Sequence, residues 1–161
     1  MPDSWATVAG WDPGVSGALC ILHLDRAGQT TRVDSHRFSK STPSDLVEAL
    51  RDARVKLCML EQVNSFGMGR ASAFKFGASW GLAKGVLIAT DTPWELITPR
   101  KWQKRFAIPK TDTQTAHKRE LKYAAQRVFP EQAKGIVLED ADSHLIAEYA
   151  RRVFLERSRR S

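Results

Sequence analysis

Two acidic residues stand at the ends of segments that otherwise have the composition of buried β-strands. The apolar run of residues 6–11 is followed by Asp12 and a Pro-Gly turn, and the run of residues 57–60 is followed by Glu61. A carboxylate that is buried alone is costly, so each acid needs a cation, several hydrogen bonds or a metal ion. Because each acid closes a core strand, we expect both to converge on one site.

The order of the elements predicts how these strands are arranged. Strands are expected at about 6–12, 17–24, 31–38, 56–61 and 94–97, and helices at about 44–50, 72–89, 99–106, 113–128 and 139–157. Three consecutive strands followed by helices that alternate with strands are typical of a mixed sheet with helices packed on it. The first and fourth strands would be neighbours in the sheet centre, which places Asp12 and Glu61 at adjacent strand ends.

The length and composition are those of one globular domain. We expect residues 1–157 to form it and residues 158–161 to be a frayed basic tail. No apolar run approaches the roughly 18 residues of a membrane-spanning helix, and the N-terminus lacks the features of a signal or transit peptide. Cys20 and Cys58 fall in predicted core strands, which favours buried thiols in a reducing compartment. We therefore expect a cytoplasmic protein that does not enter membranes.

Positive charge is concentrated in the second half of the chain. The net charge is +7 at pH 7 and the sequence pI is about 9.7. Between Arg100 and Arg127, nine basic residues are opposed by only Asp112 and Glu120. Such clustering favours a polyanionic partner, although a solvated, solubilising surface would have the same composition.

A third acidic segment opens the last predicted helix. Glu139 and Asp142 are three residues apart, so they would share one face of the first helical turn. Capping of the helix N-terminus would explain them. Alternatively they join Asp12 and Glu61, and four carboxylates are suitable ligands for two Mg²⁺ ions about 4 Å apart. His144 would point away from this face and is interpreted as a packing or surface residue.

Five segments resemble one known protein family. Residues 10–19 (GWDPGVSGAL) resemble the first motif of the RuvC-type Holliday junction resolvases. Residues 60–62 resemble the second motif, and residues 141–147 the final one. Residues 74–81 and 98–104 are most similar to the phage and organellar branch. The resemblance covers nearly the whole chain, and the order and spacing of the motifs carry it.

This resemblance implies a ribonuclease H-like fold and a Mg²⁺-dependent dimer that cleaves four-way DNA junctions. The fold would be a mixed five-stranded sheet, with three antiparallel strands, then βα units, and helices on both faces. By the resemblance, Asp12, Glu61 and Asp142 are catalytic metal ligands for two Mg²⁺ ions, which Mn²⁺ could replace. The fourth ligand is either Glu139 or Asp140, and the spacing to Asp142 favours Glu139.

The expected DNA contacts fall on a loop and on the basic segments. A Gly-rich loop follows Glu61, and in it Phe66 or Met68 could stack into an opened junction or could fold back onto the core. The full set of expected DNA-binding residues is Phe66, Met68, Arg70, Arg100, Lys101, Lys104, Arg105, Lys110, Lys118 and Lys122.

Three glycines suggest how two copies could meet. Gly77, Gly81 and Gly85 recur every four residues along the helix expected at 72–89. Each costs about 1 kcal/mol relative to Ala in a helix, so the stripe requires a reason. One reason is close packing on the sheet. The other, which the resemblance implies, is a homodimer interface that also includes Phe74.

Other function classes remain open. Residues 12–17 also resemble the phosphate loop of actin-like ATP-binding domains, but these need a second lobe for which 161 residues leave no room. A non-catalytic nucleic-acid-binding module would keep the basic segments without requiring the acids. A nuclease of the same fold could also act on other branched DNA or on RNA, because a fold does not determine a substrate.

Overall fold

A five-stranded mixed sheet forms the centre of the computed structural model, which describes residues 4–64 and 66–160. The strands are β1 (Ala6–Asp12), β2 (Ala18–Leu24), β3 (Thr30–Arg37), β4 (Leu57–Glu61) and β5 (Trp94–Ile97). Their order across the sheet is β3-β2-β1-β4-β5, with β1 to β3 antiparallel and β4 and β5 parallel to β1. The expected fold class is confirmed, and β1 and β4 are neighbours as predicted.

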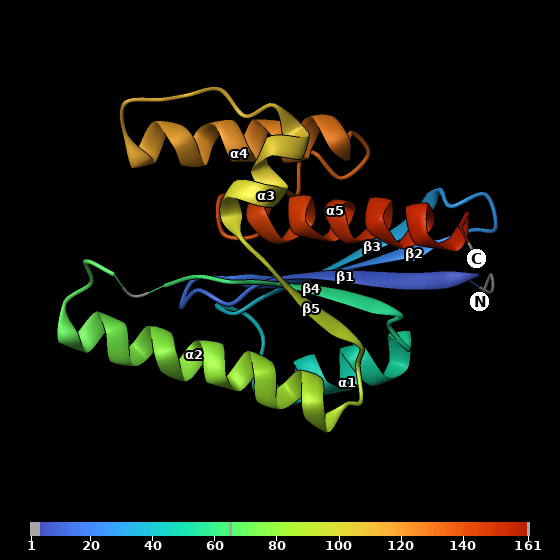
Figure 1. Ribbon diagram of the computed structural model, residues 1–161, viewed down its shortest axis with the longest axis horizontal. Helices are drawn as coiled ribbons and strands as arrows, with labels where there is room; N and C mark the ends of the chain where they lie inside the picture. The colour runs from blue at the N-terminus through green and yellow to red at the C-terminus, as the bar shows by residue number, and fades with distance from the viewer. Residues whose placement is uncertain (1–3, 65, 161) are drawn as a thin grey trace.

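Helices cover both faces of this sheet (Figure 1). One face carries α1 (Pro43–Ala53) and α2 (Arg70–Ala89), and the other carries α5 (Ala141–Ser158). On the outer side of α5 lie α4 (Gln114–Val128) and α3 (Pro99–Gln103), the latter continued by the short 3₁₀ helix η1 (Lys104–Phe106). Within the described residues, no helix is long and apolar enough to cross a membrane.

Two apolar cores follow from this layering. One lies between the sheet and the helices α4 and α5, and it includes Cys20; the other lies between the sheet and the helices α1 and α2, and it includes Cys58. Both cysteines are buried and free, as expected, and burial raises the pKa of each thiol. Because β1 is covered on both sides, its residues form a continuous buried run that ends only at Asp12.

The glycine at position 10 determines how closely α5 approaches the sheet. A Cβ atom on Gly10 would lie 2.1 Å from the backbone nitrogen of Ala147 and 2.6 Å from the backbone oxygen of Ser143. Only a residue without a side chain allows the α5 backbone to rest on β1 at this distance. The close approach brings the first turn of α5 to the end of β1, where Asp12 lies.

The start of α5 differs from the prediction. The helix was expected from residue 139, but it begins at Ala141 with Asp140 as its N-cap residue. Glu139 therefore precedes the helix and lies in a turn. The argument that Glu139 and Asp142 share a helical face is wrong, because the three-residue spacing applies only to residues within the helix.

Candidate functional site

The two strand-ending acids are neighbours across the sheet. Trp11 of β1 is in register with Leu60 of β4, so Asp12 and Glu61 follow side by side at the carboxyl ends of two parallel strands. Glu61 is buried, whereas Asp12 is partly buried and accepts a hydrogen bond of 3.0 Å from the backbone N–H of Gly14. The Pro-Gly turn after β1 thus holds one oxygen of the Asp12 carboxylate.

Asp142, on the first turn of α5, completes a cluster of three acids. Burial and then the nearby charge of Asp142 raise the pKa of Asp12 to about 6, against the weaker opposing effects of Gly14 and Lys118. Burial and the charge of Asp12 raise the pKa of Glu61 to about 8, with a smaller contribution from Asp142. These mutual effects show that the three carboxyl groups lie in one electrostatic site.

One ammonium group faces these three acids. The Nζ atom of Lys118, on α4, lies 2.7 Å from Oδ2 of Asp142. Burial alone would lower the pKa of Lys118, but the contact with Asp142 and the charges of Asp12 and Glu61 raise it overall. Among the described residues, Lys118 is the one cation that lowers the pKa of Asp12 and Glu61, so the cluster is short of positive charge when all three acids are ionised.

The donor set could hold a divalent cation. The second oxygen of Asp142, Oδ1, is buried without a hydrogen-bond partner in the described part of the chain. Oxygen ligands with unmet need for positive charge suit hard cations such as Mg²⁺ or Mn²⁺. Among the described residues, no group of three or more His, Cys, Asp or Glu side chains already surrounds a common metal position.

The two candidates for a fourth acid are engaged elsewhere. The carboxylate of Glu139 accepts hydrogen bonds from the backbone and hydroxyl of Ser39, at 3.0 and 2.8 Å, and lines a small hollow together with Lys118. The Asp140 side chain is buried and forms an ion pair of 2.7 Å with Arg37. Glu139 as a metal ligand stays a prediction, while Asp140 has a structural role.

His144 is a packing residue, as expected. Its ring is buried against the ring of Phe129, with 5.6 Å between the centroids. One ring nitrogen, Nδ1, lies 2.7 Å from the backbone oxygen of Asp140, one turn earlier. Burial lowers its pKa, so the neutral ring is favoured.

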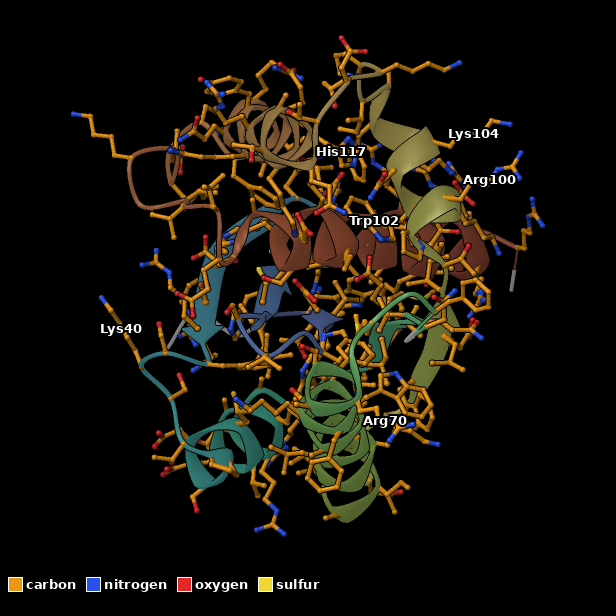
Figure 2. The ribbon with its side chains drawn as sticks, turned by 90° about the vertical axis from the view of Figure 1, so that its left-hand side faces the viewer. Lys40, Arg70, Arg100, Trp102, Lys104 and His117 are labelled. Atoms are coloured by element: carbon orange, nitrogen blue, oxygen red, sulfur yellow. The ribbon has the colours of Figure 1, made fainter. Side chains whose placement is uncertain are left out.

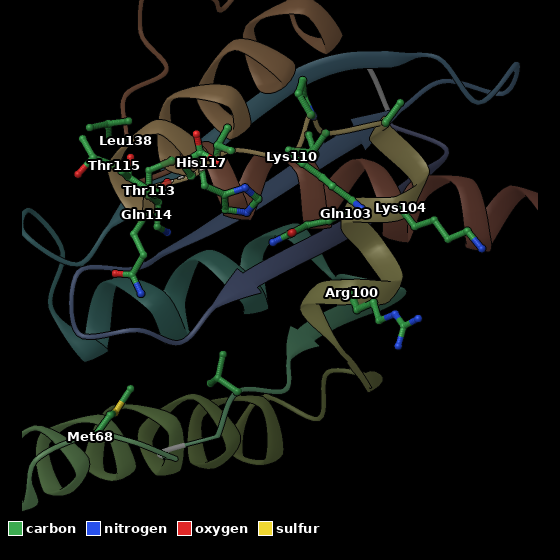
Figure 3. A pocket seen from close by; sticks show the side chains of 17 residues that line it. Met68, Arg100, Gln103, Lys104, Lys110, Thr113, Gln114, Thr115, His117 and Leu138 are labelled. Carbon is green, nitrogen blue, oxygen red and sulfur yellow. Dashed lines mark hydrogen bonds between the residues drawn. The ribbon is translucent and has the colours of Figure 1, made fainter.

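A wide cleft with basic walls opens beside the acidic cluster and includes Lys118 in its lining. Its volume is about 1450 Å³. Figure 3 shows Arg100, Gln103 and Lys104 on the α3 side and Gln114 and His117 on the α4 side. The predicted DNA-binding residues that line this cleft are Met68, Arg100, Lys104, Lys110 and Lys118.

Two solved structures share the arrangement of this sheet and its helices. Thermus thermophilus RuvC in complex with Holliday junction substrate aligns at a TM-score of 0.66 and 17% sequence identity, over 94% of this chain and 96% of that chain. The fold is that of a RuvC-type resolvase. A second structure of Thermus thermophilus RuvC aligns at a TM-score of 0.61, with the same identity and coverage. No protein-family model and no curated protein matches the sequence.

Other predicted DNA-binding residues lie outside the cleft of this RuvC-like fold. Lys101 and Arg105 line a smaller hollow, in which Arg105 approaches Glu156 at 3.3 Å. Lys122 is partly buried on α4, one turn beyond Lys118. Arg70 is exposed at the start of α2, on the opposite side of the sheet from α3 (Figure 2). The basic cluster is therefore spread over more than one surface, and only part of it faces the acids.

The loop after Glu61 projects into solvent. The Phe66 side chain is 96% exposed and that of Met68 is 43% exposed. The alternative in which these side chains fold back onto the core is wrong for Phe66, because no core residue covers it. Met68 lines the cleft from the α2 side (Figure 3), so this loop forms one border of the cleft.

The glycine stripe of α2 also faces outward. Apart from the chain neighbours and the backbone of α2 itself, a Cβ atom on Gly77, Gly81 or Gly85 would meet nothing within 4 Å among the described residues, and Phe74 beside them is 81% exposed. Close packing of these glycines on the sheet is therefore wrong as an explanation. The buried side of the helix is formed instead by Ala83, Val86 and Leu87.

Sequence reasoning missed the partner of Glu61. The indole N–H of Trp102 donates a hydrogen bond of 2.8 Å to Oε1 of Glu61. This bond lowers the pKa of Glu61, although burial outweighs it. The signal in the sequence is a single tryptophan within the basic run of residues 100–105, where a large apolar side chain needs a reason to be present.

Proposed function

We propose that this protein is a structure-specific endonuclease that resolves four-way DNA junctions by metal-dependent hydrolysis of phosphodiester bonds. The observation that carries the proposal is the cluster of Asp12, Glu61 and Asp142, which Lys118 joins to a basic cleft of about 1450 Å³: Lys118 lines the cleft and pairs with Asp142. The RuvC-like fold supports it, because a solved structure of that fold holds a Holliday junction substrate.

The three acids would hold one or two Mg²⁺ ions, with Glu139 as a further ligand. Bound metal would activate a water molecule and stabilise the leaving oxygen of the phosphodiester. Gly14 donates to one oxygen of Asp12, and Trp102 donates to one oxygen of Glu61. Among the described residues, the other oxygen of each acid therefore stays available to a ligand. The low dielectric around these buried acids would strengthen their attraction for a divalent cation.

The cations of the cleft would bind the DNA backbone. Arg100 and Lys104 are exposed on one wall, and Lys110 lies on the linker that closes it. Contacts between cations and phosphates supply most of the affinity for DNA and do not depend on base sequence. The exposed Phe66 would stack on a base at the junction centre.

Assembly as a homodimer would match the substrate. A four-way junction has approximate two-fold symmetry, so two symmetry-related active sites could make paired cuts. The outward-facing stripe of Gly77, Gly81 and Gly85, with Phe74 beside it, supports α2 as the contact. Sedimentation of the purified protein should give the mass of two copies. A monomer at working concentration would contradict the dimer.

Cleavage of a synthetic four-way junction tests the function. The wild-type protein with Mg²⁺ should nick the junction in symmetry-related strands and leave a linear duplex of the same sequence intact. Asp12→Asn should abolish cleavage while junction binding persists, because the amide keeps the shape but loses the charge. Asp52→Asn, on the exposed face of α1, is the matched control and should cleave normally.

Each alternative predicts a different result in the same assay. Binding of the junction without cleavage at any Mg²⁺ or Mn²⁺ concentration would indicate a non-catalytic binding module. Faster cleavage of branched RNA or of a splayed duplex would indicate another substrate for the same site. Normal cleavage by Asp12→Asn would show that the acidic cluster is not the active site.

A further inference from the structure

Trp102 is the inward-facing residue of a helix that otherwise presents cations. Its side chain is 0% exposed, whereas Arg100 and Lys104 of the same segment point outward (Figure 2). The indole ring packs against Phe106 with 6.4 Å between the ring centroids. The tryptophan is thus fixed in position by the apolar core on the α5 side of the sheet.

The only polar atom of the Trp102 side chain is directed at Glu61. The Nε1–H group donates to Oε1 of Glu61 at 2.8 Å, and both residues are buried. Within residues 4–64 and 66–160, this is the one hydrogen bond that the structure gives the Glu61 carboxyl group. Loss of the indole N–H would leave the buried carboxyl group without this partner.

The sheet register makes this contact possible. β5 pairs with β4 so that Ile97 is opposite Glu61, and the chain then turns at Thr98 into α3. The short helix folds back over the sheet edge, which returns residue 102 to the end of β4. Because α3 has five residues, its position depends on this packing more than on helix formation.

An indole N–H suits the task of orienting a carboxylate. It donates one hydrogen bond and accepts none, so it can hold one oxygen without competing for a cation. The second oxygen, Oε2, is left for another ligand. Partners that orient the ligands of a metal ion typically change metal affinity or activity by roughly 10–100-fold when they are removed.

We propose that Trp102 is a positioning residue that orients Glu61 for binding a divalent cation. The inference rests on the proposed function, because it assigns Glu61 a ligand role at that site. Trp102 acts only through Glu61, since its side chain is covered and cannot reach substrate in the cleft. Its contribution should therefore be seen in metal binding, before any DNA is present.

Titration of the DNA-free protein with Mn²⁺ tests this role. Trp102→Phe should raise the dissociation constant of Mn²⁺ by roughly 10–100-fold, because the ring is kept but the donor is lost. Trp11→Phe is the matched control: Trp11 is also fully buried, yet its Nε1 atom has no hydrogen-bond partner among the described residues. Trp11→Phe should leave Mn²⁺ affinity at the wild-type value.

Junction cleavage provides a second readout. The Mg²⁺ concentration for half-maximal cleavage should rise in Trp102→Phe, and the rate should recover at saturating Mg²⁺. Junction affinity measured in Ca²⁺ should stay unchanged, because the cations of the cleft are intact. If Trp102 had only a structural role, Trp102→Phe would lower the melting temperature. The Mg²⁺ concentration for half-maximal cleavage by the folded protein would then be unchanged.

A second variant keeps the test decisive if Trp102→Phe does not fold. Benzothienylalanine at position 102 replaces the N–H group by sulfur and keeps the shape of the ring, so packing is preserved while the donor is removed. It should reproduce the loss of Mn²⁺ affinity. Wild-type affinity in this variant would overturn the inference.

The outcomes separate the inference from the proposed function. Mn²⁺ binding by the wild-type protein without junction cleavage would contradict the function, while the comparison of variants would still decide the role of Trp102. Cleavage with equal Mn²⁺ affinity in wild type and Trp102→Phe would overturn the inference alone. Absence of Mn²⁺ binding to the wild-type protein would overturn it as well, because Glu61 would then be no ligand.

Discussion

Substitution of Gly10 by Ala should damage both stability and activity. The added Cβ would lie 2.1 Å from the Ala147 nitrogen, and ordinary contacts begin at 3.4 Å, so α5 would have to retreat by more than 1 Å. Both sides of this contact are backbone, and neither can rotate away. Overpacking typically costs about 1–3 kcal/mol, and a clash of this kind should reach roughly 3 kcal/mol or more of unfolding free energy. That is a large part of the stability of an ordinary domain.

Chemical denaturation of the metal-free protein measures this loss. Gly69→Ala, outside the proposed dimer contact, is the matched control: its added Cβ would meet nothing within 4 Å among the described residues beyond its chain neighbours, its φ of −64° suits alanine, and the loss of a glycine N-cap should cost no more than about 1 kcal/mol. Because α5 carries Asp142, its retreat should also separate Asp142 from Asp12 and reduce cleavage beyond the loss of folded protein. A Gly10→Ala protein with stability within about 0.5 kcal/mol of wild type would refute the reasoning.

Three further substitutions probe the cluster and the cleft. The folded-state pKa of Glu61 is raised from 4.5 to about 8, so its stabilising contribution is complete below pH 4.5 and is lost as pH rises toward 8. Denaturation in EDTA should therefore give Glu61→Gln the same free energy of unfolding as wild type at low pH and a larger one at pH 8. If the two free energies changed in parallel with pH, the raised pKa of Glu61 would be contradicted. Lys118→Met should destabilise the metal-free protein by roughly 1–3 kcal/mol, because Asp142 loses its charged partner. The loss should shrink in saturating Mg²⁺, and an equal loss with and without Mg²⁺ would argue against metal binding beside Asp142. Phe66→Ala should leave the melting temperature unchanged, since the side chain is 96% exposed, and should weaken junction cleavage by the loss of a stacking contact of about 1–3 kcal/mol. Unchanged cleavage would place Phe66 outside the bound junction.

Local patterns were sufficient to predict the sheet and two of its acids. The apolar runs before Asp12 and Glu61, with a Pro-Gly turn after the first, predict the hairpin of β1 and β2 and the buried strand β4. Parallel pairing of β1 with β4 then places both acids at one edge, because the carboxyl ends of neighbouring parallel strands coincide. This step needs only the order of elements.

The start of α5 was mispredicted because several acids compete for the same position. Glu139, Asp140 and Asp142 can each cap a helix N-terminus. The choice is made by tertiary contacts, since Arg37 on β3 pairs with Asp140 and Ser39 binds Glu139. These partners are about a hundred residues away in the chain, so no local pattern contains them.

The basic residues between 100 and 105 lie on two different surfaces because of helical geometry, which a count of charges in the sequence does not take into account. Arg100 and Lys104 are four residues apart and line the cleft. Lys101 and Arg105 are also four residues apart, but they line the smaller hollow described above. A helix places residues at this spacing on one face, so neighbours in sequence fall on different faces. Trp102 occupies the face between them that is turned to the sheet.

This arrangement joins the cleft to the acidic cluster through one short segment. The turn that exposes Arg100 and Lys104 to a polyanion is the same turn that brings Trp102 to Glu61. Because the tryptophan is fully buried, α3 cannot shift on the sheet without moving the donor that holds Glu61. The composition of residues 99–104 therefore reflects two requirements at once, namely cations for the substrate and one indole for the carboxylate.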